Sequence, residues 1–409
     1  MLRTPFHPLR THRRRGLTTP AVAVALIVTM AGLALIVDRL WLDAADLELT
    51  TATESAALAA ARCLASDDLL RPNADPSERL HTAREEAAWV AGQNLVAGQP
   101  VTVNSEPHGD VRLGRLILDE FEKQVRFEES DNKPTTAVVT AQRTRATSNP
   151  VGLFVSGLTG IPFGDVSCRV EASIDNRIIG VRPFEGSPVP ALPLAIWWKD
   201  STGQRRDTWE QQIEARRGAD NYGFESKAGE VYRVADGIPE IVLRSQARGQ
   251  TSGQSNVLVL DIGTGFQDKE LARQFVSGWS ADDLADLDGE MRVTPSNPEK
   301  FGASAELKHD DREALDILIG EPRICLLYSD ARPGVGSSLL KATCVRLVAI
   351  RVLAIRDNSN GSCEVVVQPC VFATRTALLD EMTPYYTGLA DETSTDNANP
   401  YIYKLQLTH

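Results

Sequence analysis

An uninterrupted run of uncharged, mostly apolar residues from Leu17 to Val37 constrains the fold of this chain more than any other feature. A helix rises about 1.5 Å per residue, so a helix over this run covers about 30 Å, which matches the hydrocarbon core of a bilayer. The run therefore predicts one membrane-spanning helix within residues 16–38, and hence a single-pass membrane protein.

The charges around this run predict its orientation. Residues 1–15 hold no acidic side chain and several arginines: Arg3, Arg10, Arg13, Arg14 and Arg15. By the positive-inside rule this basic head is cytoplasmic and the C-terminal bulk is extracytoplasmic, with Arg39 and Trp41 at the far interface. The net charge of the chain is −12. The acidic charge of the C-terminal bulk argues against nucleic acid as a partner, because binding to phosphates requires basic side chains.

Two other interpretations of the apolar run compete with a membrane span. A cleaved secretory signal would also have a basic start, and Ala44 and Ala45 offer small residues for cleavage. However, the run is longer than the apolar region of a typical signal, and the charged Asp38, Arg39 and Asp43 precede these alanines. A buried core helix would need protein to cover the whole run, and the adjoining arginines argue against it.

Two helices are expected beyond the span. Residues 39–72 are rich in alanine and lack glycine and internal proline, so they predict a stalk helix that continues out of the membrane. Asp75-Pro76-Ser77-Glu78 has the order of an N-cap, a first-turn proline and a first-turn acid, which predicts a helix over residues 75–97. The small residues of the stalk allow close packing. We interpret that face as docking on the protein's own globular part, with a partner or a second copy as the alternative.

The rest of the chain predicts an α+β fold in two parts. Residues 73–182 contain short β-branched runs and form a small α+β extracytoplasmic domain. Prolines and glycines gather in residues 183–193, which is typical of a linker. Residues 194–383 form a strand-rich α+β C-terminal domain, in which Asp357–Gly361 (DNSNG) predicts a tight turn between strands. Residues 384–409 form an acidic polar tail, most of which is expected to be loosely ordered.

The order of several segments along the chain resembles that in a known protein family. The basic head, the span that ends in Val37-Asp38 and the alanine-rich Thr51–Ala61 (TATESAALAAA) resemble the start of TadG-like proteins of bacterial tight-adherence (Tad, or Flp) pilus-assembly systems. Later segments are similar to these proteins more loosely: Leu113–Leu116, Thr136–Arg143, Gly152–Gly160, Val166–Ile174, Gly320–Ile324, Leu327–Ser329 and Val365–Pro369.

The resemblance implies a role in Flp/Tad pilus assembly or in surface adherence. A protein of this kind is a membrane-anchored extracytoplasmic component in the bacterial inner membrane. It acts by protein-protein contact with other pilus-assembly or membrane proteins, is not an enzyme and takes no cofactor. One segment departs from the prepilin-like members, because Ala21 stands where the glutamate read by prepilin peptidase would follow Gly16. Processing at Gly16 is therefore not implied.

No residue stands out as catalytic, cofactor-binding or metal-ligating. Some TadG-like members carry a von Willebrand A metal site, but Asp261–Gly265 (DIGTG) lacks its two serines, so we interpret it as a strand-end turn. Gly334–Ser338 (GVGSS) lacks the lysine of a phosphate-binding loop and predicts a hairpin loop. The histidines outside the head and the C-terminus lack a second ligand in zinc-binding spacing: His81, His108 and His309.

Pairs of acidic and of aromatic residues are the remaining candidates for a catalytic or a ligand-binding site. Asp282-Asp283 and Asp310-Asp311 fit helix N-termini or solvent-facing positions better than acid-base catalysis. Trp197-Trp198 is the best aromatic candidate for ligand stacking, although one of two consecutive strand residues normally faces a core. The alternatives are thus a membrane-anchored extracytoplasmic hydrolase with no recognisable motif and a sugar-binding module at Trp197-Trp198.

The cysteines predict a disulfide between Cys325 and Cys344. Turn-forming residues between them indicate a hairpin, and a register with Tyr328 opposite Lys341 places the two cysteines opposite each other. Opposed residues of a hairpin have Cα atoms about 5 Å apart, which permits a bond in the oxidising extracytoplasmic space. The alternative is that the cysteines are buried free thiols.

Overall fold

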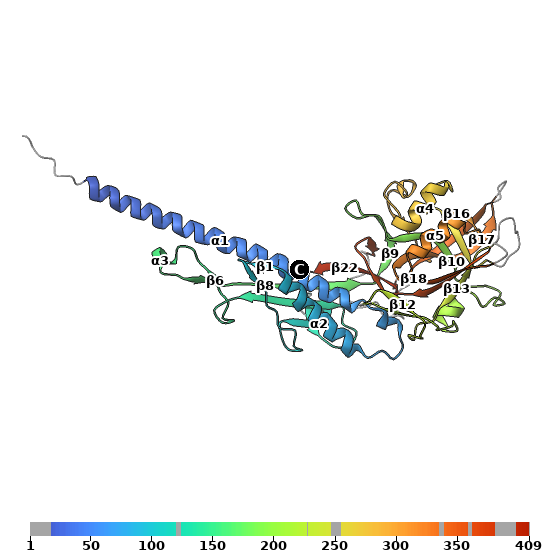
Figure 1. Cartoon of the computed structure of the whole chain (residues 1–409), viewed down its shortest axis with the longest axis horizontal. Helices are drawn as coiled ribbons and strands as arrows, with labels where there is room; N and C mark the ends of the chain where they lie inside the picture. The colour runs from blue at the N-terminus through green and yellow to red at the C-terminus, as the bar shows by residue number, and fades with distance from the viewer. Residues whose placement is uncertain are drawn as a thin grey trace, which may run out of the picture.

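The computed structural model describes residues 18–119, 124–226, 228–246, 255–334, 339–358, 362–380 and 398–408. Figure 1 shows one long helix that enters a small unit of strands and helices, with a larger strand-rich unit beyond it. The predicted mixed α+β class, with a long apolar N-terminal helix and a strand-rich C-terminal region, is confirmed. The basic head and Gly16 lie outside the described residues.

Helix α1 (Thr18–Leu64) runs without a break through the predicted span and most of the predicted stalk. Its first half is exposed, whereas its second half is buried on one face from Ala45 to Leu64. The helix ends before the predicted boundary at residue 72, and a short 3₁₀ turn, η1 (Asp67–Leu70), follows. The stalk is therefore not a free rod, because its alanine-rich face lies in the core of the small unit.

A six-stranded sheet forms the other half of that core. Its order is β20-β22-β8-β5-β3-β4, with antiparallel neighbours except for the parallel pair β20–β22. The strands are β3 (Val111–Asp119), β4 (Gln124–Glu129), β5 (Thr136–Arg143), β8 (Val166–Asp175), β20 (Phe372–Ala373) and β22 (Ile402–Thr408). Helix α1 packs on β5 and β8. The alanines of α1 allow this close approach to side chains such as Val139, Ala141 and Ala172.

Helix α2 (Pro76–Gln93) lies against α1 and begins as predicted. Asp75 is its N-cap, and the carboxylate oxygen Oδ1 of Asp75 accepts a hydrogen bond of 2.9 Å from the backbone N–H of Ser77. Two small hairpins complete the unit. One joins β1 (Leu95–Val96) and β2 (Gln99–Pro100), and the other joins β6 (Val151–Gly152) and β7 (Phe163–Gly164) around the short helix α3 (Ser156–Thr159).

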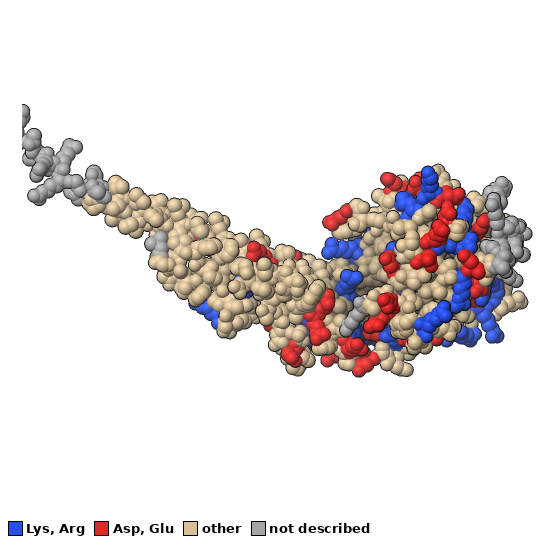
Figure 2. All heavy atoms as spheres, viewed as in Figure 1, with Lys and Arg blue, Asp and Glu red and all other residues tan. Residues whose placement is uncertain are grey.

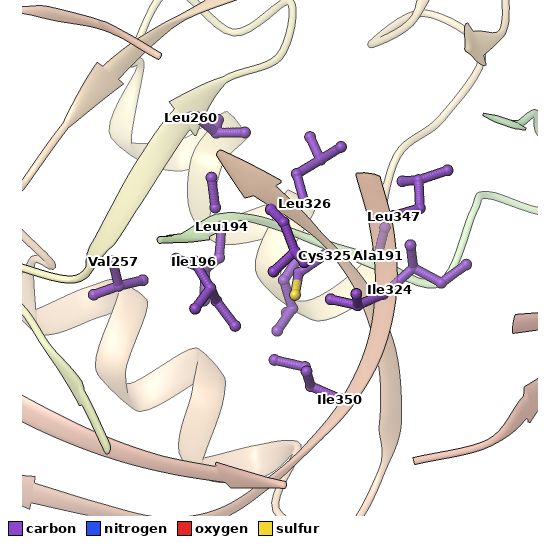
Figure 3. Packing of buried hydrophobic residues seen from close by; sticks show 14 of the residues in the cluster. Ala191, Leu194, Ile196, Val257, Leu260, Ile324, Cys325, Leu326, Leu347 and Ile350 are labelled. Carbon is purple, nitrogen blue, oxygen red and sulfur yellow. The ribbon is translucent and has the colours of Figure 1, made fainter. Parts of the chain in front are cut away.

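The C-terminal unit is built on a sheet that closes on itself. The seven-stranded order is β13-β19-β18-β16-β14-β10-β17, and β17 also pairs with β18, so β10, β14, β16, β18 and β17 form a ring. The strands are β10 (Ala191–Trp197), β13 (Ile241–Arg244), β14 (Val257–Asp261), β16 (Glu299–Ser304), β17 (Pro322–Pro333), β18 (Leu340–Asp357) and β19 (Cys363–Pro369). Figure 3 shows apolar side chains of β10, β14, β17 and β18 gathered in its core.

Shorter elements surround this ring. Helices α4 (Asp268–Ser277) and α5 (His309–Ile317) contact each other and pack on β10 and β18, respectively. A three-stranded sheet has the order β15-β9-β21. The remaining elements are β9 (Ile178–Val181), β15 (Met291–Arg292), β21 (Ala377–Leu379), β11 (Gly223–Glu225), β12 (Glu230–Tyr232), the π-helical turn η2 (Glu210–Glu214) and η3 (Ala285–Leu287).

Two predicted boundaries differ from the structure. The proposed linker at 183–193 lies within the C-terminal unit, because Val189 pairs with Trp279 and Ala191 begins β10. The proposed tail at 384–409 contains β22, which pairs with β8 in the small unit. The polar composition belongs to residues 384–400, whereas Tyr403, Leu405 and Leu407 alternate with polar residues and face the core of the small unit. Residues 384–397 lie outside the described part of the chain.

Buried ionic contacts connect η1, the turn that follows α1, to the C-terminal unit. The guanidinium Nη1 of Arg351 lies 2.7 Å from Oδ2 of Asp67, and the other carboxylate oxygen of Asp67 accepts a 2.7 Å hydrogen bond from the backbone N–H of Val371. Arg351 also donates to the carbonyl of Gly320 and lies over the ring of Phe224. Both charged side chains are largely buried. These contacts form a junction between Asp67 and the C-terminal unit.

We predict that Arg351→Met destabilises the fold by about 3 kcal/mol, because it leaves the Asp67 carboxylate buried without its counter-charge. Chemical unfolding of the full chain in detergent measures this change. Arg332→Met is the matched control, since the Arg332–Asp330 pair is exposed and such pairs contribute at most about 1 kcal/mol. Equal stability of the two variants would contradict a structural role for the junction.

Candidate functional surfaces

The first half of α1 has the properties of a membrane span. Among the described residues, one helix is long and apolar enough to cross a membrane, and only 6% of its most apolar segment is buried. Figure 2 shows few charged side chains along it. This exposure is inconsistent with the buried core helix considered above. A signal cleaved near Ala45 would have to be cut inside α1.

A hollow of about 570 Å³ lies on the face of the six-stranded sheet that points away from α1. Val139 and Ala141 of β5 point into the core, whereas the alternating Val138, Thr140 and Gln142 line the hollow. Its charged lining residues come from neighbouring strands and a loop: Asp110, Arg112, Glu129 and Arg169. No sequence motif predicts this site, because its residues come together only through strand pairing.

The two arginines of the hollow form ion pairs at its rim. Nε of Arg112 lies 2.9 Å from a carboxylate oxygen of Glu129, and Arg169 lies 2.9 Å from Glu171 on its own strand. These pairs are partly exposed to solvent. The edge strand β4 next to them is exposed at every position except the half-buried Phe127. The hollow and this edge together form an open polar surface that suits contact with a protein.

The Trp197-Trp198 pair lies at the end of β10, and the protein's own side chains cover its rings. The ring of Trp197 stacks on Tyr328 with centroids 6.4 Å apart, and the Arg205 guanidinium lies 4.7 Å from the Trp197 centroid. Lys199 lies 4.5 Å from the Trp198 centroid, and Arg346 lies 5.5 Å from it. Because cations and a tyrosine occupy these faces, the pair is a poorer stacking surface than its sequence suggests.

The Asp261–Gly265 segment is a strand-end turn. It follows β14, and Oδ1 of Asp261 accepts hydrogen bonds from the backbone N–H groups of Thr264 and Gly265 at 3.1 and 2.7 Å. The hydroxyl of Thr264 donates to the same oxygen at 3.0 Å. Gly263 has a φ of 71°, which a glycine adopts without strain. The carboxylate thus closes the turn.

The acid pairs also have structural partners. In the first pair, Asp283 binds the Arg273 guanidinium and accepts a 2.7 Å hydrogen bond from the backbone N–H of Ser280. In the second pair, Asp311 is buried at the start of α5 and accepts a 3.0 Å hydrogen bond from the backbone N–H of Lys308. Burial raises the pKa of Asp311 to about 6. Asp311 therefore caps the start of α5.

The histidines are placed apart from one another. His81 pairs with Glu85 and His309 pairs with Glu313, each one helical turn away on an exposed face. In the described ranges, no group of three or more His, Cys, Asp and Glu side chains is arranged to hold a metal ion. Gly334 is described, but the rest of the GVGSS segment lies outside the described residues.

The predicted disulfide is wrong. Cys325 lies opposite Val348, and Cys344 lies opposite Tyr328, so the register is shifted from the predicted one. The strands also extend further into the presumed loop, to Pro333 and Leu340. All six cysteines are free, and four of them are buried: Cys325, Cys344, Cys363 and Cys370. Burial raises the pKa of Cys370 to about 12 and that of Cys363 to about 11, which makes both thiols unreactive.

Comparisons with known proteins identify no relative. No protein-family model matches the chain, and neither a curated protein nor a solved structure is significantly similar to it.

We predict that the buried Asp311 makes stability depend on pH. Its pKa is higher in the fold than the 3.8 of an ordinary aspartate, so the contribution of Asp311 to stability is fully present below pH 3.8 and is lost as the pH rises through about 6. Asp311→Asn keeps an acceptor oxygen but cannot titrate. Relative to the wild type, this variant should gain about 2 kcal/mol between pH 4 and pH 7 in chemical unfolding. Asp310→Asn, at the exposed neighbouring residue, should follow the wild type.

We further predict that the buried thiols resist alkylation without forming disulfides. In the folded protein without reductant, iodoacetamide should leave Cys325, Cys344 and Cys370 unmodified, because burial raises each thiol pKa and blocks access. After unfolding without reductant, all six cysteines should react. Peptide mass spectrometry measures both states, and a linked Cys325–Cys344 peptide pair would contradict the strand register.

Proposed function

We propose that this chain is a membrane-anchored extracytoplasmic component of a TadG-like pilus-assembly system and that it acts by protein-protein contact. The basic head, the apolar span and the alanine-rich segment after it support this proposal through their resemblance to such proteins. In this arrangement the head is cytoplasmic, α1 crosses the bacterial inner membrane, and both folded units lie in the periplasm.

One observation carries the proposal. The exposed apolar half of α1 continues without a break into the half that is buried against β5 and β8. An enzyme on a flexible tether can search for substrate, but a domain built around its own anchor helix keeps a fixed position relative to the membrane. Such a fixed position suits a part of an assembly that must present a surface to neighbouring proteins.

The open hollow on the six-stranded sheet is the surface that we assign to this contact. It lies in the small unit next to the anchor, and its arginines and acids make ion pairs that a partner's charges can replace. Strand β4 lies at the edge of this sheet in the described part of the chain, and an exposed sheet edge is a place where a partner strand can add. The covered rings of Trp197 and Trp198 give less support to a sugar-binding module, and no observation favours a hydrolase.

We predict that the hollow is required for pilus formation. Deletion of the gene should abolish surface fibres, and the wild-type chain should restore them. The double variant Arg112→Glu/Arg169→Glu should restore less than a tenth of the wild-type number, because it replaces both positive charges of the hollow with negative ones. Electron microscopy counts the fibres, and immunoblots of membranes verify equal protein levels.

Arg332→Glu is the control, because Arg332 is an exposed arginine in the C-terminal unit. It should restore fibres as the wild type does. Unchanged fibres in the deletion strain would contradict the proposed function. Full restoration by the double variant would contradict only the assigned surface.

A further inference from the structure

The β6–β7 loop, residues 151–164, has an unusual composition and surface. It contains no ionisable side chain. It exposes large apolar side chains to the surroundings: 67% of Phe154, 53% of Ile161 and 45% of Phe163. A cluster of this kind on the surface of a folded domain indicates an interaction site.

This loop packs against α1 at the point where the apolar run ends. The Oδ1 atom of Asp38 accepts hydrogen bonds from the backbone N–H groups of Phe154 and Val155 at 2.9 and 3.2 Å. The indole N–H of Trp41 donates to the carbonyl of Gly152 at 3.1 Å, and the rings of Trp41 and Phe154 are 4.8 Å apart. Figure 1 shows α3 and β6 beside α1 on the side from which the helix protrudes.

The loop reaches beyond Asp38 into the apolar part of the helix. Helix α3 contacts α1, and Ala34, one turn before Asp38 on the same face, is only 5% exposed. Its neighbours Leu33 and Leu35 are 57% and 56% exposed. Four residues of helix span about 6 Å. The loop therefore lies about 6 Å deep in the layer that the membrane must occupy if residues 17–37 cross it.

We infer that the β6–β7 loop is a second membrane contact, which inserts Phe154, Ile161 and Phe163 among the lipids of the periplasmic leaflet beside α1. The inference rests on the membrane anchoring in the proposed function. Lipid is the occupant because the exposed face of the loop continues the exposed apolar face of α1. Trp41 lies at the same level, where aromatic side chains prefer the interface.

Such a position requires that the polar backbone groups of the loop bond within the protein, and several of them do. Besides the two N–H groups held by Asp38, the N–H of Leu153 bonds to the carbonyl of Pro162, and that of Ile161 bonds to the Thr159 hydroxyl. Further internal bonds come from Thr159 to Val155 and from Gly160 to Ser156. Asp38, itself 95% buried by the loop and helix, thus has a positioning role at the membrane boundary.

Spin labels on the full chain in liposomes test this inference. Ile161→Cys reports on the loop, Val28→Cys on the span and Ile317→Cys on an exposed site of α5 in the C-terminal unit. Each is made with Cys63→Ser and Cys168→Ser, because these two half-exposed cysteines would also react, whereas the others are buried. Oxygen concentrates in hydrocarbon and a neutral nickel chelate stays in water, so the ratio of their collision rates with each nitroxide reports lipid exposure.

We expect the ratio at residues 161 and 28 to exceed that at residue 317 several-fold. A ratio at 161 equal to that at 317, with 28 in lipid, would overturn the loop contact and leave the anchoring intact. A ratio at 28 equal to that at 317 would overturn the anchoring and the loop contact together. Protection of residue 161 from both reagents would show that protein covers the loop instead of lipid, which also overturns the inference.

Discussion

The structure depends on one helix, α1, whose two halves are both apolar but have different surroundings. The first half of α1 exposes large side chains such as Leu26 and Ile27, whereas the second half buries small ones such as Ala56 and Ala60 against the sheet. Large side chains increase contact with a fluid surrounding, while small ones let a backbone approach a sheet closely. The change in residue size along α1 therefore specifies where the folded unit begins. The small unit cannot form without this helix, because α1 supplies much of its core.

The C-terminal unit is held to this helix at two separated points of the chain. Directly after α1, Asp67 binds Arg351 of β18. Strand β22 near the other end of the sequence returns to pair with β8, and the buried Asp175–Arg177 pair lies where β8 leads into the C-terminal unit. Breaking one connection leaves the other in place. Packed structure rather than a linker therefore joins α1 to the distal unit.

Local signals in the sequence predict part of this fold, and non-local pairing accounts for the rest. The apolar run and the Asp75 cap of α2 act over a few residues, and the structure contains both. The turn predicted at Asp357–Gly361 lies partly outside the described residues, but the strands β18 and β19 on either side of it pair with each other. The register of Cys325 and Cys344 depends on how far β17 and β18 extend and on the bulges between them, which turn residues alone do not reveal. The alternation of Tyr403, Leu405 and Leu407 with polar residues is a local signal for β22, but its pairing with the distant β8 is not local. The hollow and the β6–β7 loop escape prediction for the same reason, since each combines distant segments.

Asp38 shows how contact between distant segments changes the environment of a single residue. In the sequence it marks the end of the apolar run, where an acid is expected to face water. In the fold it is 5% exposed, and its carboxylate binds the backbone of a loop more than a hundred residues away. A charge at this depth is costly unless hydrogen bonds compensate it. The Oδ1 atom of Asp38 accepts two backbone hydrogen bonds from the loop, which offsets part of this cost, whereas its buried Oδ2 atom has no hydrogen-bond partner among the described residues.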